Sequence, residues 1–234
     1  HMTSSELFRS VGFVDRYYVQ MSDFYRDSFS TEDEMIEFFV KVFRNDTTDK
    51  TPRQMMNQIQ QLVSIANDID RIRPARDPLR MFFIKTCMEA LCSLSKNKKE
   101  NFYKEFPTFM STEGKDYILS HFSLSHFDEI YMGHPFQASH ELTIDDFFSI
   151  IKVVRDIVAH EGNYWEMQFF THSTDDATWL SSLETDKKIL KSYKYLCERK
   201  LRRTYHFETT MQYERFRHYF LEACIGFLLA YISE

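Results

Sequence analysis

The chain has 234 residues, of which only five are glycine and five are proline. This scarcity of turn-forming residues argues against β-sandwiches, β-barrels and doubly wound α/β folds, and it favours long helices. Hydrophobic residues make up 43% of the chain and charged residues 27%, which excludes intrinsic disorder. The formal net charge of −6 excludes a general cationic attraction to nucleic acids or membranes, so an anionic partner would need a local basic patch.

The first half of the chain carries repeated helix-start signals. Thr31-Glu32-Asp33-Glu34 forms a capping box before apolar residues at helical spacing. Thr51-Pro52 and Asp77-Pro78 each place a polar residue and an N1 proline before an apolar pattern. The pattern after Asp77-Pro78 is apolar nearly all round, so we expect that helix to be central. Helices are predicted over residues 5–26, 32–43, 51–73, 79–94, 97–106 and 112–122.

The second half mixes further helices with two short alternating segments. Thr143 and Asp146 predict the start of a helix, and Gly162 predicts its C-terminal stop. Residues 164–170 and 203–209 alternate apolar and polar side chains, so we expect them to pair as a small β-ribbon. Helices are predicted over residues 144–161, 186–199 and 213–233. The prediction is therefore one mostly helical domain.

Several familiar sites and locations are not expected. The chain lacks HExxH, GxxxxGK[ST], GxGxxG and GxSxG patterns, so we expect no metal ion, no cofactor and no hydrolase serine. Cysteines 87, 92, 197 and 224 form no CxxC pair and are expected to be reduced, buried thiols of a cytoplasmic protein. No membrane association is expected, because the most apolar run, residues 223–232, is about half of the roughly 20 residues of a membrane helix. His1-Met2 resembles a tag remnant, and no signal peptide is expected.

One predicted helix carries a charge on its apolar side. Within residues 144–161, Arg155 falls about 20° from Ile144 around the helix, inside the apolar stripe. A guanidinium there must be paired or line a polar seam, because an unpaired buried charge is strongly unfavourable. His160 follows in the last turn, where the helix dipole stabilises an imidazolium. The alternative is an edge arginine with a buried stem and an ordinary C-terminal histidine.

The segment Arg155-Asp156-Ile157-Val158-Ala159-His160 resembles the Arg-to-His motif of the HEPN superfamily, at the end of a long apolar helix as in that family. Asp156 stands where the family more often has Asn, and Glu161 separates His160 from the following glycine. Met88-Glu89-Ala90-Leu91 resembles the "E-A-L" turn of the family's central helix.

The resemblance covers residues 78–234 and implies an all-α fold, a helical bundle of HEPN type. We expect the small β-ribbon within residues 164–209 to be an addition to this bundle. Residues 1–77 have no counterpart in the resemblance, and we expect them to form an extra N-terminal helical region packed on the same domain.

The resemblance also implies a homodimer through the helix Ile144–Glu161 and, as in many family members, metal-independent RNA cleavage in toxin–antitoxin or phage-defence systems. His160 would act as general base on the ribose 2′-OH or as acid toward the 5′-oxygen, and Arg155 would hold the phosphate. Asp156 would orient a neighbouring histidine or arginine, or be an inert surface residue. Arg155 and His160 point about 140° apart on an ideal helix, so a cleft shared by two protomers suits them better than one protomer alone. An antitoxin or regulatory protein is an implied partner.

A second hypothesis is a non-catalytic HEPN module that serves as an RNA-binding or protein-interaction scaffold. Arg155 and His160 would then only connect the two protomers. The intact Arg/His pair favours the nuclease, whereas the acidic net charge favours the scaffold.

A concentrated basic run follows the motif helix. Tyr193, Tyr195 and Tyr205 interleave with its cations, so the run predicts binding of the RNA backbone with some base stacking. The alternative is a solvated helix face near a C-terminus. The cations are Lys187, Lys188, Lys191, Lys194, Arg199, Lys200, Arg202 and Arg203.

Overall fold

The computed structural model describes residues 15–74, 76–96, 105–160, 167–169 and 178–233, together with Glu6 and Arg9. Most of the helix predicted over 97–106, and both Glu161 and Gly162, lie outside the described residues. The helices are α2 (Asp15–Tyr25), α3 (Glu32–Phe43), α4 (Thr51–Ile72), α5 (Asp77–Leu94), α7 (Thr112–His121), α8 (Ile144–His160) and α9 (Tyr213–Ser233), with 3₁₀ helices η1 (Arg26–Ser28) and η2 (Phe106–Phe109). The strands are β1 (Phe122–Tyr131), β2 (His134–Ala138), β3 (Trp179–Thr185) and β4 (Arg203–Thr209).

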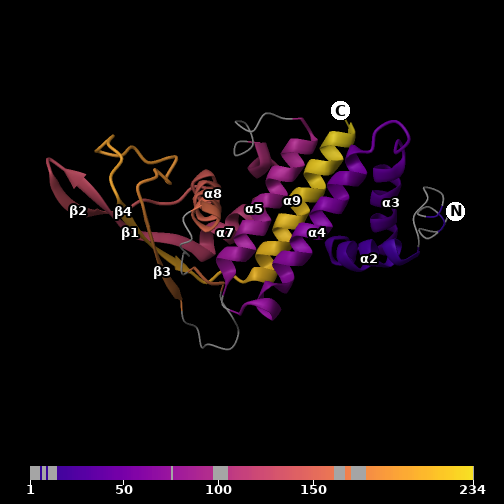
Figure 1. Ribbon diagram of the computed structural model, residues 1–234, viewed down its shortest axis with the longest axis horizontal. Helices are drawn as coiled ribbons and strands as arrows, with labels where there is room; N and C mark the ends of the chain where they lie inside the picture. The colour runs from indigo at the N-terminus through magenta and orange to yellow at the C-terminus, as the bar shows by residue number, and fades with distance from the viewer. Residues whose placement is uncertain are drawn as a thin grey trace.

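Helices α4, α5 and α9 lie side by side as a bundle, with α2 and α3 at one end and α8 on the side toward the sheet (Figure 1). α5 is central, as predicted, and Ser93 is its one exposed residue. Phe106 of η2 contacts Phe220 and Phe227 of α9, with ring centroids 5.7 and 6.2 Å away, so aromatic contacts join η2 to the bundle. None of the described helices combines the length and apolarity needed to cross a membrane.

Two of the four predicted caps form, those of Thr31 and Thr143, whereas α5 already includes Asp77. Thr31 Oγ1 accepts a hydrogen bond from the Glu34 amide (3.2 Å) at the start of α3. Thr143 Oγ1 accepts from the Asp146 amide (3.2 Å), and the Asp146 carboxylate accepts from the Thr143 amide (3.0 Å). Thr51 is not a cap, because α4 already includes it and the preceding lysine makes no capping bond. A reciprocal cap therefore fixes the start of α8, a one-way cap from Thr31 fixes that of α3, and α4 has neither.

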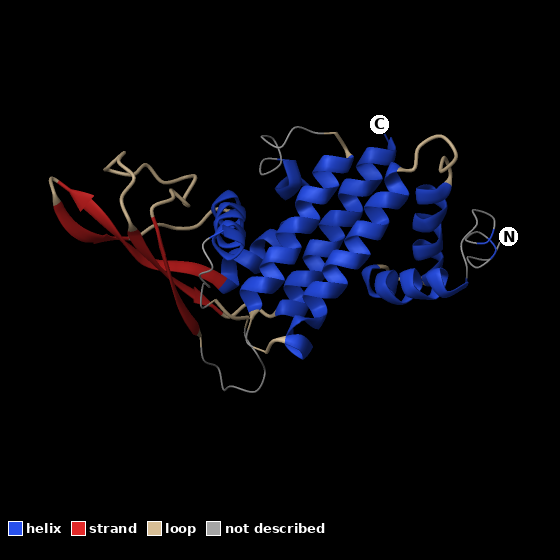
Figure 2. Ribbon diagram, viewed as in Figure 1, coloured by secondary structure: helices blue, strands red, loops and turns tan. Residues whose placement is uncertain are grey.

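A four-stranded antiparallel sheet in the order β2-β1-β4-β3 lies on the far side of α8 (Figure 2). The expected all-α fold is therefore wrong, and the protein is mixed α/β. The strand predicted over residues 203–209 is confirmed as β4, but it pairs with β1 and β3. Of its expected partner, residues 164–170, only 167–169 are described, and they form no strand.

A β-bulge explains why the sequence pattern of β1 is inconspicuous. The register against β4 shifts between Leu124 and His126. Phe122 and Leu124 are buried before the shift, and Phe127 and Glu129 after it, so the inward side changes from even to odd positions. An alternation whose phase changes midway does not match a template of period two.

The helix predicted over residues 186–199 is also wrong. Residues 186–202 form an irregular connection between β3 and β4, which we call the basic loop. Its backbone is bonded to buried side chains instead of to itself: the Ser192 amide donates to Asp146 Oδ1 at 2.9 Å. Tertiary hydrogen bonds here override the helical spacing of the sequence.

Candidate functional site

α8 carries the predicted motif and lies between the bundle and the sheet. All residues from 146 to 151 are buried within one chain, whereas Ala159 and His160 in the last turn are exposed. Apart from Asp145 in the first turn, the exposed residues of α8 therefore lie in its C-terminal turn. The predicted dimer through the helix Ile144–Glu161 stays a prediction.

Arg155 is paired, as its place in the apolar stripe requires. Its Nη2 donates to Glu89 Oε1 of α5, and its Nε lies 3.4 Å from Asp156 Oδ1. The Arg155 side chain keeps 21% exposure. Its Nε is buried without a hydrogen bond to any described residue, so Asp156 neutralises the charge but does not satisfy this donor.

Lys85 completes what we call the α5–α8 charge cluster, which consists of Lys85, Glu89, Arg155 and Asp156. Lys85 is fully buried, and its Nζ lies 2.6 Å from the same Glu89 oxygen that Arg155 contacts. Burial lowers the pKa of Lys85 to about 8, although Glu89 acts in the opposite direction. Burial acts to raise the pKa of Glu89, but Lys85 and Arg155 outweigh it, and the pKa is lowered.

Lys85 is not among the residues that the sequence singles out, although its spacing from Glu89 is a usable signal. Lys85 and Glu89 are four residues apart in a helix whose other positions are apolar nearly all round. An ion pair at this spacing on a central helix must be buried or face another charged element. Here that element is α8.

His160 stands apart from this cluster. It is exposed and forms no hydrogen bond or ion pair with the described residues. Asp156 Oδ2 instead lies 4.0 Å from Lys187 Nζ, at the start of the basic loop. The structure thus brings Arg155 to Glu89 and Asp156 to Lys187, but it does not bring Arg155 to His160.

The predicted basic run does not form one surface. Lys187 pairs with Asp156, Lys188 with Glu198, and Arg202 with Glu184. The cations that are exposed without an ion pair to the described residues are Lys191, Lys194, Arg199 and Lys200.

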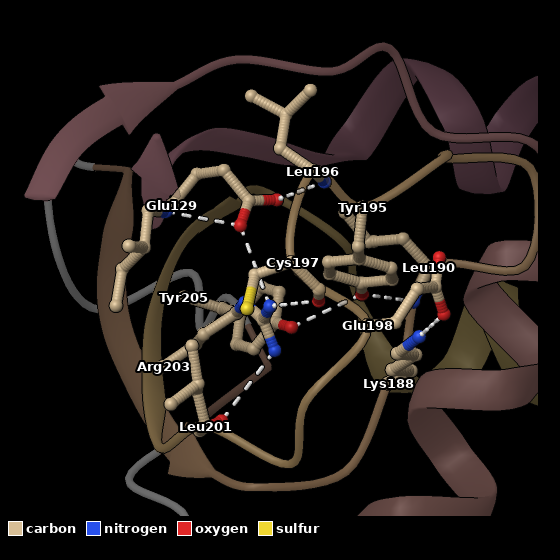
Figure 3. Close-up of polar contacts among 11 residues, drawn as sticks. Glu129, Lys188, Leu190, Tyr195, Leu196, Cys197, Glu198, Leu201, Arg203 and Tyr205 are labelled. Carbon is tan, nitrogen blue, oxygen red and sulfur yellow. Dashed lines mark hydrogen bonds and ion pairs between the residues drawn. The ribbon is translucent and has the colours of Figure 1, made fainter. Parts of the chain in front are cut away.

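Arg203 is buried at 2% exposure, so it cannot contribute to an exposed RNA surface (Figure 3). Its Nη2 lies 3.3 Å from Glu129 Oε1 and donates to the Cys197 carbonyl at 2.9 Å. The rings expected to stack on bases are mostly inside as well. Tyr195 and Tyr205 are 5% and 0% exposed, and their hydroxyls are 3.0 Å apart.

A serine, a histidine and an aspartate meet where the basic loop crosses the start of α8. His140 Nε2 lies 2.8 Å from Ser192 Oγ and 3.1 Å from Asp146 Oδ2, and Ser192 Oγ donates to the same oxygen at 2.6 Å. In a catalytic triad the carboxylate binds the other ring nitrogen and the serine donates to the histidine. Here the serine proton goes to Asp146. The arrangement therefore attaches the loop and does not activate a nucleophile.

Among the residues that the structure describes, no three or more histidine, cysteine or acidic side chains are grouped to hold a metal ion. Cys87, Cys92 and Cys224 are buried as expected, whereas Cys197 is half-buried. Comparison of the chain with protein-family models, with curated proteins and with solved structures finds no match.

Proposed function

We propose that this chain is a metal-independent endoribonuclease of the HEPN type, with Arg155 and His160 as its catalytic residues. The observation that carries the proposal is the α5–α8 charge cluster, which lies next to the exposed last turn of α8. It joins Glu89 and Arg155, which come from the two separate segments that resemble the family. Charged side chains in a seam between two apolar helices are unfavourable unless they are paired or used.

The reaction needs only groups that the chain supplies. One imidazole removes the proton from the ribose 2′-OH, the 2′-oxygen attacks phosphorus, and the bond from phosphorus to the 5′-oxygen breaks. A second imidazole donates the proton that the leaving 5′-oxygen takes up. The products are a 2′,3′-cyclic phosphate and a 5′-OH. Arg155 stabilises the charge on the phosphate oxygens, which require a positioned cation in the transition state.

A dimer would supply the two imidazoles. Because most of α8 is buried within its own chain, we propose that the two-fold axis passes near the last turn, where His160 is exposed. Arg155 binds Glu89 through one N–H of Nη2 and faces Asp156 through Nε, so Nη1 and the second hydrogen of Nη2 are the donors left for a phosphate.

One observation favours the scaffold as the second candidate. Glu89 and Asp156 neutralise Arg155 within one chain, so the guanidinium has a structural role without any RNA. In that case, replacing Arg155 would destabilise the packing of α5 on α8, and replacing His160 would change nothing.

The test is cleavage of a mixed RNA pool by the purified protein in excess EDTA, followed by analysis of the product ends. We expect cleavage with cyclic-phosphate ends, and no cleavage of DNA, which lacks the 2′-OH. His160→Ala should lower the rate by roughly two to four decades, the usual contribution of a positioned acid or base.

His218→Ala is a matched control, because His218 is an exposed histidine (51%) on another helix, α9. It should cleave RNA at the wild-type rate. Equal RNA cleavage by wild type and His160→Ala, or activity that disappears with EDTA, would reject the nuclease in favour of the scaffold. Light scattering of the same samples reports whether the protein is a dimer.

A further inference from the structure

The β1–β2 hairpin projects at the end of the molecule farthest from α2 and α3 (Figure 1). Large apolar side chains are exposed there: Tyr131 by 54%, Met132 by 81% and Phe136 by 40%. Leu196 of the basic loop is 56% exposed. We call these four residues the hairpin patch. A cluster of exposed apolar side chains is found at contact surfaces more often than elsewhere on a protein.

The strand register places Tyr131 and Phe136 on one face of the hairpin, and one hydrogen bond brings the backbone of Leu196 to that face. Phe136 pairs with Glu129, and Tyr131 follows Glu129 by two positions on the same side of β1. The Leu196 amide donates to Glu129 Oε2 at 3.4 Å, and its side chain points away from that carboxylate (Figure 3). The basic loop therefore carries Leu196 over the sheet face that holds Tyr131 and Phe136, and Met132 lies in the turn at the end of this hairpin.

Met132, in the turn of the hairpin, has a backbone conformation that is unfavourable for a residue with a side chain. Met132 and Gly133 form a two-residue turn with φ of 49° and 82°. Glycine or asparagine adopts this left-handed conformation more readily than methionine. An unbranched, adaptable methionine at the most exposed position suits contact with an apolar partner.

Positive charge surrounds Leu196. Lys194, Arg199 and Lys200 are exposed within four residues of it, and the one acidic neighbour, Glu198, is paired with Lys188. Glu129 is buried against Arg203. The partner that complements this surface is therefore apolar and negatively charged.

Addition of a partner strand to the hairpin is disfavoured. Tyr131 and His134 flank the two-residue turn and form its hydrogen-bonded pair, so the next residue, Pro135, faces the outer edge of β2. Proline has no amide hydrogen to donate to a further strand. A partner must bind through side chains, as an amphipathic helix does.

We propose that the hairpin patch binds an acidic amphipathic helix of a protein partner. Met132 and Leu196 are aliphatic and bury well against leucine-like residues, as do the rings of Tyr131 and Phe136. Because these two rings could also stack on RNA bases, a single-stranded RNA is included as a comparison probe. The proposal does not depend on the ribonuclease activity, because neither Arg155 nor His160 takes part.

The experiment uses a fluorescein-labelled helical peptide with leucine on one face and glutamate on the other, and fluorescence anisotropy as readout. The comparison probes are the same peptide with lysine in place of glutamate, and a single-stranded 12-nucleotide RNA. We expect the acidic peptide to bind at least tenfold more tightly than the basic one.

The double variant Met132→Ser, Leu196→Ser should weaken binding of the acidic peptide at least tenfold. The matched control is Ile65→Ser, Ile72→Ser, which removes two exposed apolar side chains from α4 and should bind as wild type does. The proposal is overturned if the acidic peptide does not bind or if both double variants weaken it equally. It is also overturned if the patch variant loses RNA binding or self-association instead, since either would identify a different occupant.

Discussion

The helical bundle and the half formed by the sheet and the basic loop are held together in different ways. In the bundle, α4, α5 and α9 bury apolar side chains against one another. The basic loop has no regular backbone, and two buried carboxylates attach it: Glu129 of β1 and Asp146 of α8. Apolar packing is spread over many residues, whereas such polar attachments concentrate the stability of a segment in a few. Single substitutions should therefore act most strongly in the second half.

Glu129→Ala should have the largest effect, a loss of about 3–5 kcal/mol in the free energy of unfolding. The substitution leaves Arg203 buried at 2% exposure without its counter-charge, and it removes the acceptor of the Leu196 amide. Denaturation by urea, followed by circular dichroism, measures the change.

The paired substitution Glu129→Met, Arg203→Met separates the charge from the packing. Burying two apolar side chains in place of an ion pair is often neutral or stabilising, and Arg203 Nε already lacks a hydrogen-bond partner among the described residues. We expect the double variant to be much more stable than Glu129→Ala. If both are equally unstable, the pair does not act through its charges.

The sequence predicts these two halves unequally, for a physical reason. Helical periodicity and caps are local, so the sequence predicts the cap at Thr31 that starts α3 and the helix over residues 213–233 with its correct bounds. The basic loop depends on the hydrogen bond from the Ser192 amide to Asp146, which lies 46 positions earlier in the sequence. No local pattern predicts this bond.

The candidate site shows the same limit. The sequence predicts that Arg155 is paired, but Glu89 as its partner lies 66 positions away. The burial of Arg203 cannot be predicted from the local sequence, where it stands at the end of a run of cations. It depends on Glu129, which lies 74 positions earlier. Residue type and spacing thus select candidates, and long-range pairing decides which of them are accessible.

Asp146→Ala tests the second attachment, and we expect a loss of about 2–3 kcal/mol, since the carboxylate accepts charge-assisted bonds from Ser192 and Thr143. Burial acts to raise the pKa of Asp146, but these hydrogen bonds lower it overall. Its stabilisation is therefore present above the unfolded pKa of about 4 and is lost as the pH falls through the lower folded pKa. Unfolding measured at pH 7 and pH 3 should show a smaller difference between wild type and variant at pH 3.

Lys85 gives a pH dependence of the same sign in the bundle, but at alkaline pH. Burial lowers its folded pKa to about 8, below the unfolded value of about 10.4, so the unfolded chain binds more protons between these values. Stability from this group rises with pH over that window. Relative to Lys85→Met, the wild type should gain about 2 kcal/mol between pH 7 and pH 9.5. If the difference in unfolding free energy between the two proteins does not change with pH, Lys85 stays protonated in the folded state.

The smallest effect should be a gain in stability, at the hairpin turn. Met132 has a φ of 49°, and a side chain in the left-handed region costs about 1 kcal/mol relative to glycine. Met132→Gly should therefore stabilise the sheet by at most about 0.5 kcal/mol, after the greater entropy of unfolded glycine is counted. Gly133→Ala, with nothing within 4 Å of the added carbon, should destabilise it through backbone strain alone. If Met132→Gly stabilises the fold and also weakens the acidic peptide, the methionine is retained for contact at the expense of stability. If it destabilises the fold, Met132 packs on the hairpin, and its exposure is not that of a docking residue.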